Sequence, residues 1–265
     1  MIPAIASALD AIVGSVTSLV SARGARRAYE LYIMTGIAEG LASAGCAVRV
    51  QRCDGTAILS HDADRRIHQR GGAPTGVSGA LQGPHHASSF VFRTPGSARQ
   101  WEIWNGIQFV GRSAGSHEID ISIVPRAVGV ALRGMPGGGL PIGRPSLAIE
   151  CKDVSDPGSG DEMRAFVARL YDLTILRSHT KVRHLPKPLR AISPSSGPRT
   201  VAHETFWTGN RETFNVIARR TGFAKGAAAM TAYYAIQPHG PVAPGTAADT
   251  ALINAIVGWI MANLA

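Results

Sequence analysis

The sequence predicts an α/β domain with a mixed central sheet flanked by helices. Apolar, strand-like segments alternate along the chain with segments of helical periodicity. One apolar segment, at 146–154, precedes a helical pattern and then further strand-like stretches, an order typical of a βαβ crossover. With 265 residues, 45% of them hydrophobic, the chain is long and apolar enough to bury a core.

The expected domain organisation has three parts. Residues 1–25 are expected to form an apolar N-terminal helix, residues 26–240 the main domain, and residues 241–265 an apolar C-terminal helix. A signal peptide is disfavoured, because no basic segment precedes the N-terminal apolar run and Asp10 interrupts it. The apolar tail at 248–265 is too short to predict a membrane span.

The first half of the main domain alternates between helix and strand patterns. Its helix has apolar residues at helical spacing, with Gly45 just past the end. Residues 54–100 are rich in Gly, Pro, Ser and His and predict a loop-rich insertion. The elements expected are a helix at 28–43, strands at 47–53, 89–92, 101–110 and 117–124, and a Pro- and Gly-rich connector at 125–145.

The second half contains the expected crossover strand and a strongly basic stretch at 174–203 without Asp or Glu. The helix expected after the crossover strand has acidic residues in its first turn, which supports its assignment. The elements expected are a strand at 146–154, a helix at 161–176, strands near 201–207 and 230–236, a helix near 212–220, and the docked C-terminal helix at 248–265.

Composition narrows the class of partner. The formal net charge of +9 favours a polyanion, with nucleic acid ahead of an anionic membrane. Three cysteines without a CxxC pair form neither a disulfide framework nor a structural zinc site. We therefore expect a protein of the reducing cytoplasm, with no membrane association.

Two strands carry charge where a strand should be apolar, in His-Glu-Ile-Asp-Ile at 117–121 and Leu-Ala-Ile-Glu-Cys-Lys at 147–152. Strand alternation places Glu150 and Lys152 on one face, roughly 7 Å apart, and Cys151 on the other as a core thiol. Likewise, Glu118 and Asp120 are expected on one face, opposite the residues at 117, 119, 121 and 123. Buried carboxylates are costly unless paired, and a divalent metal is a common partner.

These residues resemble the PD-(D/E)XK nuclease superfamily, which has the restriction-endonuclease-like fold. That family places an Asp at the end of one strand and Glu-x-Lys on the next, with a helix packed beside them. Asp120 matches the Asp, and Glu150 and Lys152 match the (D/E)xK. Ile119 replaces the Pro of the family's name, and Glu30 lies on the first helix, where many branches supply a further acid. The resemblance covers roughly residues 26–176.

The resemblance implies a metal-dependent endonuclease that hydrolyses DNA in restriction or genome defence. Asp120, Glu150 and Glu30 are then the expected ligands of Mg²⁺, which prefers hard oxygen donors and for which Mn²⁺ can substitute. Lys152 would orient the attacking water or stabilise developing charge, or act as a base if a nearby cation depressed its pKa. A homodimer is expected, because the family often pairs two sites to cut both strands.

The sequence allows more than one role for several of these residues. Arg164 and Arg169, on the helix at 161–176, are candidates to touch a phosphate or a catalytic acid, or are exposed helix arginines. Glu118 is an accessory acid or a structural partner of an arginine. The basic stretch is expected to contact nucleic-acid phosphates, independently of base sequence, through Lys181, Arg183 and Lys187. The alternatives in function are a non-catalytic nucleic-acid-binding or assembly module of the same fold, and an RNase or toxin-type nuclease acting on RNA.

Overall fold

The computed structural model describes residues 2–13, 18–21, 28–63, 65–69, 88–111, 113–134, 139–173, 190–193, 197–200 and 213–265. Within these ranges the helices are α1 (Ile2–Val13), α2 (Ala28–Ser43), α3 (Arg126–Arg133), α4 (Gly160–Leu173), α6 (Ala227–Tyr233) and α7 (Ala247–Asn263). The strands are β1 (Ser18–Ser21), β2 (Ala47–Gln51), β3 (Arg66–Gln69), β4 (Ser89–Arg93), β5 (Trp101–Val110), β6 (Ser116–Pro125), β7 (Leu140–Ile142), β8 (Leu147–Lys152), β9 (Arg190–Ser193), β10 (Gly197–Thr200), β11 (Phe214–Arg219) and β12 (Ile236–His239).

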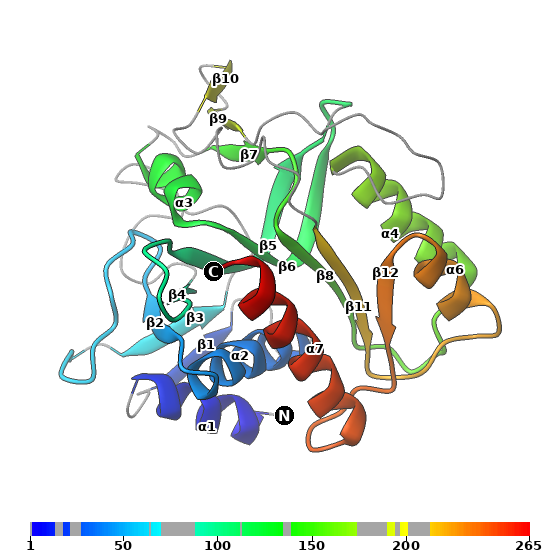
Figure 1. Ribbon diagram of the computed structural model, residues 1–265, viewed down its shortest axis with the longest axis horizontal. Helices are drawn as coiled ribbons and strands as arrows, with labels where there is room; N and C mark the ends of the chain where they lie inside the picture. The colour runs from blue at the N-terminus through cyan, green and yellow to red at the C-terminus, as the bar shows by residue number, and fades with distance from the viewer. Residues whose placement is uncertain are drawn as a thin grey trace.

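A mixed sheet forms the centre of the fold (Figure 1). Its described strands run in the order β10-β9-β7-β5-β6-β8-β11-β12, and β4 joins β2 to β5. The pair β5–β6 is antiparallel, as is β6–β8, whereas β8 and β11 are parallel. The predicted α/β class is therefore confirmed. A separate parallel pair is formed by β1 and β3.

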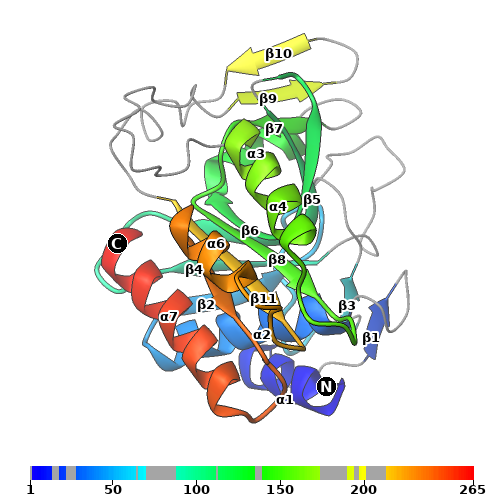
Figure 2. The ribbon, with the colours of Figure 1, turned by 90° about the vertical axis from the view of Figure 1, so that its right-hand side faces the viewer.

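Helices cover both faces of the sheet (Figures 1 and 2). One core cluster joins α1, α2 and α7 to strand residues such as Ile121 and Ile149. A second cluster joins α3, α4 and α6 to residues such as Trp104 and Ile217. The sheet is thus buried on both sides in its centre, which explains why β8 and β11 are nearly continuous apolar runs.

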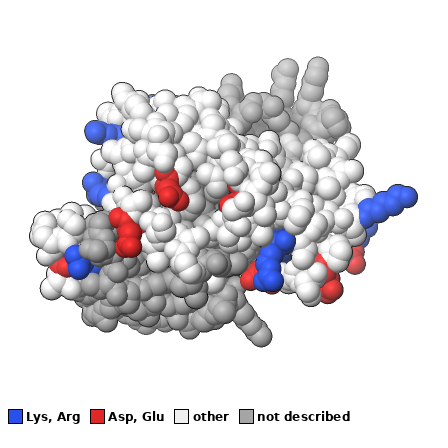
Figure 3. Space-filling view, turned by 90° about the horizontal axis from the view of Figure 1, so that it is seen from below, with Lys and Arg blue, Asp and Glu red and all other residues white. Residues whose placement is uncertain are grey.

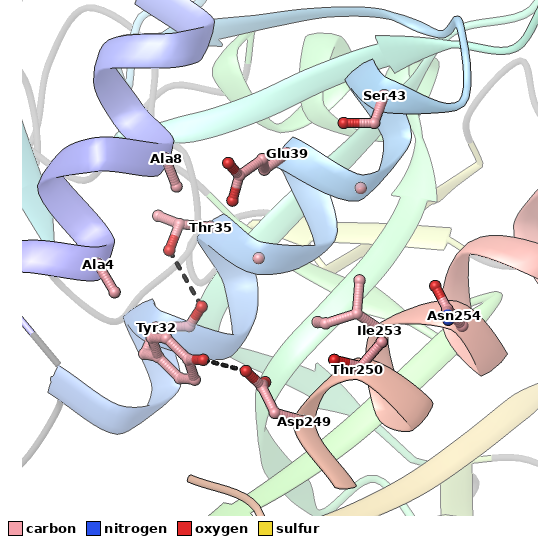
Figure 4. A pocket seen from close by; sticks show the side chains of 12 residues that line it. Ala4, Ala8, Tyr32, Thr35, Glu39, Ser43, Asp249, Thr250, Ile253 and Asn254 are labelled. Atoms are coloured by element: carbon pink, nitrogen blue, oxygen red, sulfur yellow. Dashed lines mark hydrogen bonds between the residues drawn. The ribbon is translucent and has the colours of Figure 1, made fainter. Parts of the chain in front are cut away.

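Close packing holds α2 against α7. A Cβ placed on Gly40 would lie 2.9 Å from Ile253 Cγ2 and 3.0 Å from Val257 Cγ2, so only glycine lets the two helices approach this closely. Beside this contact, α1, α2 and α7 enclose a groove of about 320 Å³ (Figure 4). The Tyr32 hydroxyl donates a hydrogen bond to the Asp249 carboxylate within it.

The bounds of the central strand pair agree with those expected, because its apolar runs and its turn are clear in the sequence. The expected hairpin at 101–110 and 117–124 is confirmed as β5 and β6. The helix at 28–43 and the strand at 89–92 are confirmed as α2 and β4, and the Glu-x-Lys strand as β8. The helix after it is α4.

Four expectations about local structure are wrong. The helix expected near 212–220 is β11, a short and mostly apolar segment whose length and β-branched residues suit a buried parallel strand. The strand expected near 230–236 is mostly α6, with β12 beginning only at Ile236. The connector at 125–145 contains α3 and β7, since Val128 and Leu132 recur one helical turn apart. The N-terminal helix ends at Val13, and β1 follows.

The strand expected near 201–207 lies outside the described residues. Among the helices of the described ranges, none has the length and apolar character needed to cross a membrane.

Candidate active site

The candidate site lies where β6 and β8 stop pairing. Their antiparallel ladder runs from Ile123 opposite Leu147 to Ile121 opposite Ile149. One more step in this register would place Asp120 opposite Glu150, but the ladder ends before it. Instead, the Cys151 amide donates to Asp120 Oδ2 at 2.8 Å. A carboxylate side chain therefore accepts the hydrogen bond that a strand carbonyl would normally take.

The other edge of β6 is also interrupted at Asp120. Asn105 pairs with Ile121 and Ile107 with Ile119, so Gly106 lies between them, opposite Asp120. Gly106 has a φ of 61°, in the left-handed region that favours glycine. Asp120 thus occupies a break in the regular ladder on both of its sides.

This break corrects one expectation. Ile119 and Ile121 were expected on one face of β6 because they are two residues apart. Ile121 packs in the cluster with α2, whereas Ile119 packs in the cluster with α4. The left-handed backbone at Gly106 disturbs the regular alternation of the hairpin, and the strand pair changes sides there.

Glu150 is the most buried acid of the site, with 1% of its side chain exposed. Its Oε1 lies 2.5 Å from Lys152 Nζ and 2.5 Å from Arg169 Nη2. Its Oε2 is buried and has no hydrogen-bond partner among the residues that the structure describes. The predicted shared face of Glu150 and Lys152 is confirmed by this contact, and two cations fix the carboxylate through one oxygen.

Arg169 and Arg164 occupy α4 but differ in environment. Arg169 faces the sheet and also donates to the Glu118 carbonyl at 3.3 Å. Arg164 pairs with Asp161 one turn earlier and keeps 68% of its side chain exposed. Arg169 therefore contacts an acid, whereas Arg164 is an exposed helix arginine.

Glu30 reaches the site from the first turn of α2. Asn105 Nδ2 donates to Glu30 Oε2 at 2.7 Å and to the Asp120 carbonyl at 2.9 Å. Three of the predicted acids therefore approach one another from a helix and two strands. The sequence analysis missed Asn105, although a polar residue within the apolar run of β5 is an available signal.

The electrostatics reflect this crowding of acids. Burial raises the pKa of Asp120 to about 7, and the carboxylates of Glu150 and Glu30 act in the same direction. Burial lowers the pKa of Lys152, but the Glu150 carboxylate outweighs it, so that the pKa is raised overall. Lys152 is therefore an ammonium at neutral pH. Burial also raises the pKa of the Cys151 thiol well above its ordinary value, as expected for a core thiol.

A second set of polar contacts fastens the tip of the β5–β6 hairpin to the end of α4. Asp172 accepts hydrogen bonds from the Ser113 hydroxyl at 2.6 Å and from the Ser113 amide at 2.8 Å. His117 Nε2 lies 2.7 Å from the same carboxylate. We call these three residues the hairpin clasp. It ties the strand of Asp120 to the helix of Arg169.

The donor set suits a hard divalent cation. Carboxylate oxygens are the ligands that Mg²⁺ prefers, and the buried Oε2 of Glu150 is an acceptor to which no described residue donates. Among the described residues, no three His, Cys, Asp or Glu side chains are grouped closely enough to hold a metal ion. Binding would therefore require the carboxylates to draw together. The predicted contacts Lys181, Arg183 and Lys187 lie outside the described residues.

Comparisons with protein-family models, with curated proteins and with solved structures found no significant match. The case for a function therefore depends on the residues and their geometry.

Proposed function

We propose that the protein is a Mg²⁺-dependent endonuclease that hydrolyses phosphodiester bonds of DNA. The observation that carries this proposal is the convergence of Glu30, Asp120 and Glu150 beside Lys152, at the point where β6 and β8 separate. The order of elements agrees with the resemblance: a helix with an acid, an Asp strand, a Glu-x-Lys strand and a helix beside them. The restriction-endonuclease-like fold and a role in restriction or genome defence are proposed on the same resemblance.

Each side chain has a distinct part in the proposed reaction. Asp120, Glu150 and Glu30 would hold Mg²⁺, which when bound neutralises phosphate charge and lowers the pKa of water. Lys152 carries a positive charge and three donors next to the acids, which suits stabilisation of the charge that develops on the phosphate. Arg169 holds Glu150 through Oε1 and leaves Oε2 available.

The DNA partner is supported by charge. The chain has a formal net charge of +9, and phosphate contacts by basic side chains are the main source of affinity for nucleic acid. On the face shown in Figure 3, the described charged side chains are scattered and form no continuous basic patch. A homodimer is proposed for cleavage of both strands.

A cleavage assay tests the proposal. Supercoiled plasmid, linear duplex, branched DNA and RNA are each incubated with the protein in Mg²⁺, Mn²⁺ or EDTA. We expect DNA cleavage in either metal and none in EDTA. Asp120→Ala and Lys152→Ala should lower the rate at least about 100-fold, whereas Arg164→Ala, on the exposed side of α4, should leave it unchanged. Cleavage by both site variants at the wild-type rate would overturn the mechanism.

The second candidate is a non-catalytic nucleic-acid-binding or assembly module. It is favoured by the contacts of Lys152 and Arg169 with Glu150, which compensate the buried carboxylate without a metal. This candidate predicts DNA binding in EDTA and no cleavage of any substrate. An RNase or toxin-type nuclease would use the same residues and is separated from the main proposal by the RNA arm of the assay.

A further inference from the structure

We infer that Asn105 is a positioning residue that holds Glu30 against the strand of Asp120 and so sets the contribution of α2 to metal binding. This inference rests on the proposed function, because it concerns the same site. It assigns a role to a residue of β5 that carries no charge and bears none of the chemistry itself.

Asn105 links two elements that no backbone ladder joins. Its Nδ2 donates to Glu30 Oε2 on α2 at 2.7 Å and to the Asp120 carbonyl on β6 at 2.9 Å. Both hydrogens of one amide group are therefore used, one on each element. Because the Asp120 carbonyl belongs to the strand, the amide is fixed relative to β6 and can in turn fix Glu30.

The chemistry of the two acceptors determines which way the amide points. A carboxylate and a carbonyl can only accept hydrogen bonds, so the nitrogen must face both of them. Asn105 Oδ1 is then left buried, with no partner in the described part of the chain. An unsatisfied buried acceptor is costly, and such a group calls for an explanation beyond packing. The donor side of the amide supplies that explanation.

The position of Asn105 also connects it to the break in the ladder. It directly precedes Gly106, whose left-handed backbone lies opposite Asp120. The side chain of Asn105 donates to the Asp120 carbonyl at the residue where regular pairing fails. A displacement of Asn105 would therefore move Asp120 and Glu30 relative to each other.

The test measures metal affinity directly, apart from cleavage. Mn²⁺ is titrated by calorimetry into the full-length wild type, Asn105→Leu, Asn105→Ala and Glu30→Gln. Leucine has nearly the shape of asparagine and leaves no cavity, so this variant should fold even if alanine does not. Asn215→Ala, which removes another buried asparagine of the sheet, is the matched control.

We expect Asn105→Leu to weaken Mn²⁺ binding about 10- to 100-fold, as is usual for residues that orient metal ligands. Glu30→Gln should weaken it as well, and combining the two should cost less than the product of the single effects, since both remove the same contribution. Asn215→Ala should bind like the wild type. Thermal unfolding of each variant shows whether loss of structure explains a loss of affinity.

The outcomes separate the two proposals. Equal Mn²⁺ affinity of Asn105→Leu and the wild type would overturn the positioning role and leave the nuclease proposal standing. Multiplicative effects in the double variant would also overturn it, because Asn105 would then act independently of Glu30. Absence of Mn²⁺ binding by the wild type would overturn both proposals.

Discussion

Lys152 Nζ and Arg169 Nη2 meet at the same carboxylate oxygen of Glu150, each at 2.5 Å. One cation comes from the strand of Glu150 and the other from α4, so the helix is attached to the sheet through the acid itself. The orientation of Glu150 thus depends on where α4 sits. The second oxygen of Glu150 has no partner within the described ranges.

The two arginines of α4 provide a matched pair of substitutions. We expect Arg169→Ala to lower the free energy of unfolding by about 1–3 kcal/mol, because it takes a charged hydrogen bond from a buried carboxylate. Arg164→Ala should change it by less than about 0.5 kcal/mol, since the pair with Asp161 is exposed. Urea denaturation measures both. Equal effects of the two variants would show that Arg169 does not anchor Glu150.

The raised pKa of Asp120 predicts how the stability of the fold depends on pH. Its pKa is raised by burial and by Glu150 and Glu30 to about 7, above the ordinary value of 3.8. The folded state therefore binds more protons than the unfolded state between these values, and stability falls as pH rises through this window. Asp120→Asn lacks this penalty. Its unfolding free energy relative to the wild type should increase from pH 4 to pH 7 and level off above, by on the order of a few kcal/mol.

This comparison is made by urea denaturation in EDTA at each pH. A difference between Asp120→Asn and the wild type that does not change with pH would contradict the prediction. Repeating the series with Mg²⁺ tests the proposed ligand role, because a cation at Asp120 should stabilise the wild type and not the variant.

The hairpin clasp predicts the opposite pH dependence. Burial raises the pKa of Asp172, but the hydrogen bonds from Ser113 and His117 outweigh it and lower the pKa overall. A carboxyl with a lowered pKa stabilises the fold above its unfolded pKa, and this stabilisation is lost as pH falls through the folded value. Asp172→Asn should therefore cost about 1 kcal/mol at pH 7, and this cost should shrink as the pH falls below the ordinary value of 3.8. Thermal unfolding from neutral to acidic pH checks it, and a cost that does not change with pH would point to packing.

Two glycines test the packing of α2 against α7. Gly40→Ala places a methyl group 2.9 Å from Ile253 Cγ2, so we expect a loss of about 1–3 kcal/mol in unfolding free energy. Gly258→Ala, within α7 and with no atom within 4 Å of the new methyl, should gain about 0.5–1 kcal/mol from helix propensity. Chemical denaturation distinguishes the two signs. A gain in both variants would mean that the helices can move apart at little cost.

The parts of the fold that the sequence predicts well are those with a strong local period. The helix α2 and the hairpin β5–β6 have clear periodicity and clear ends, and the structure agrees with them. The sequence predicts a helix where β11 lies, because so short and mostly apolar a segment fits both periods. Its assignment is decided by the parallel pairing with β8, which is a contact between distant parts of the chain.

In the candidate site, too, local sequence patterns predict some residues and miss others whose roles depend on distant contacts. Asp120, Glu150 and Lys152 could be found because acids and a lysine are conspicuous within apolar strands. The different environments of Arg169 and Arg164 could not be predicted, because both lie on one helix. Only the position of α4 against β8 distinguishes them. Asn105 was overlooked since its role depends on Glu30, which lies 75 residues away along the chain.

The hydrogen bond from the Cys151 amide to Asp120 Oδ2 provides an internal probe of the site. A backbone amide that donates to a carboxylate senses the charge of that group through its proton chemical shift and its rate of exchange with solvent. Any change at Asp120, whether protonation or the arrival of a cation, should therefore appear in the signal of one peptide group at the centre of the sheet. The state of the site can then be followed by nuclear magnetic resonance without a substrate and without an added label on any side chain.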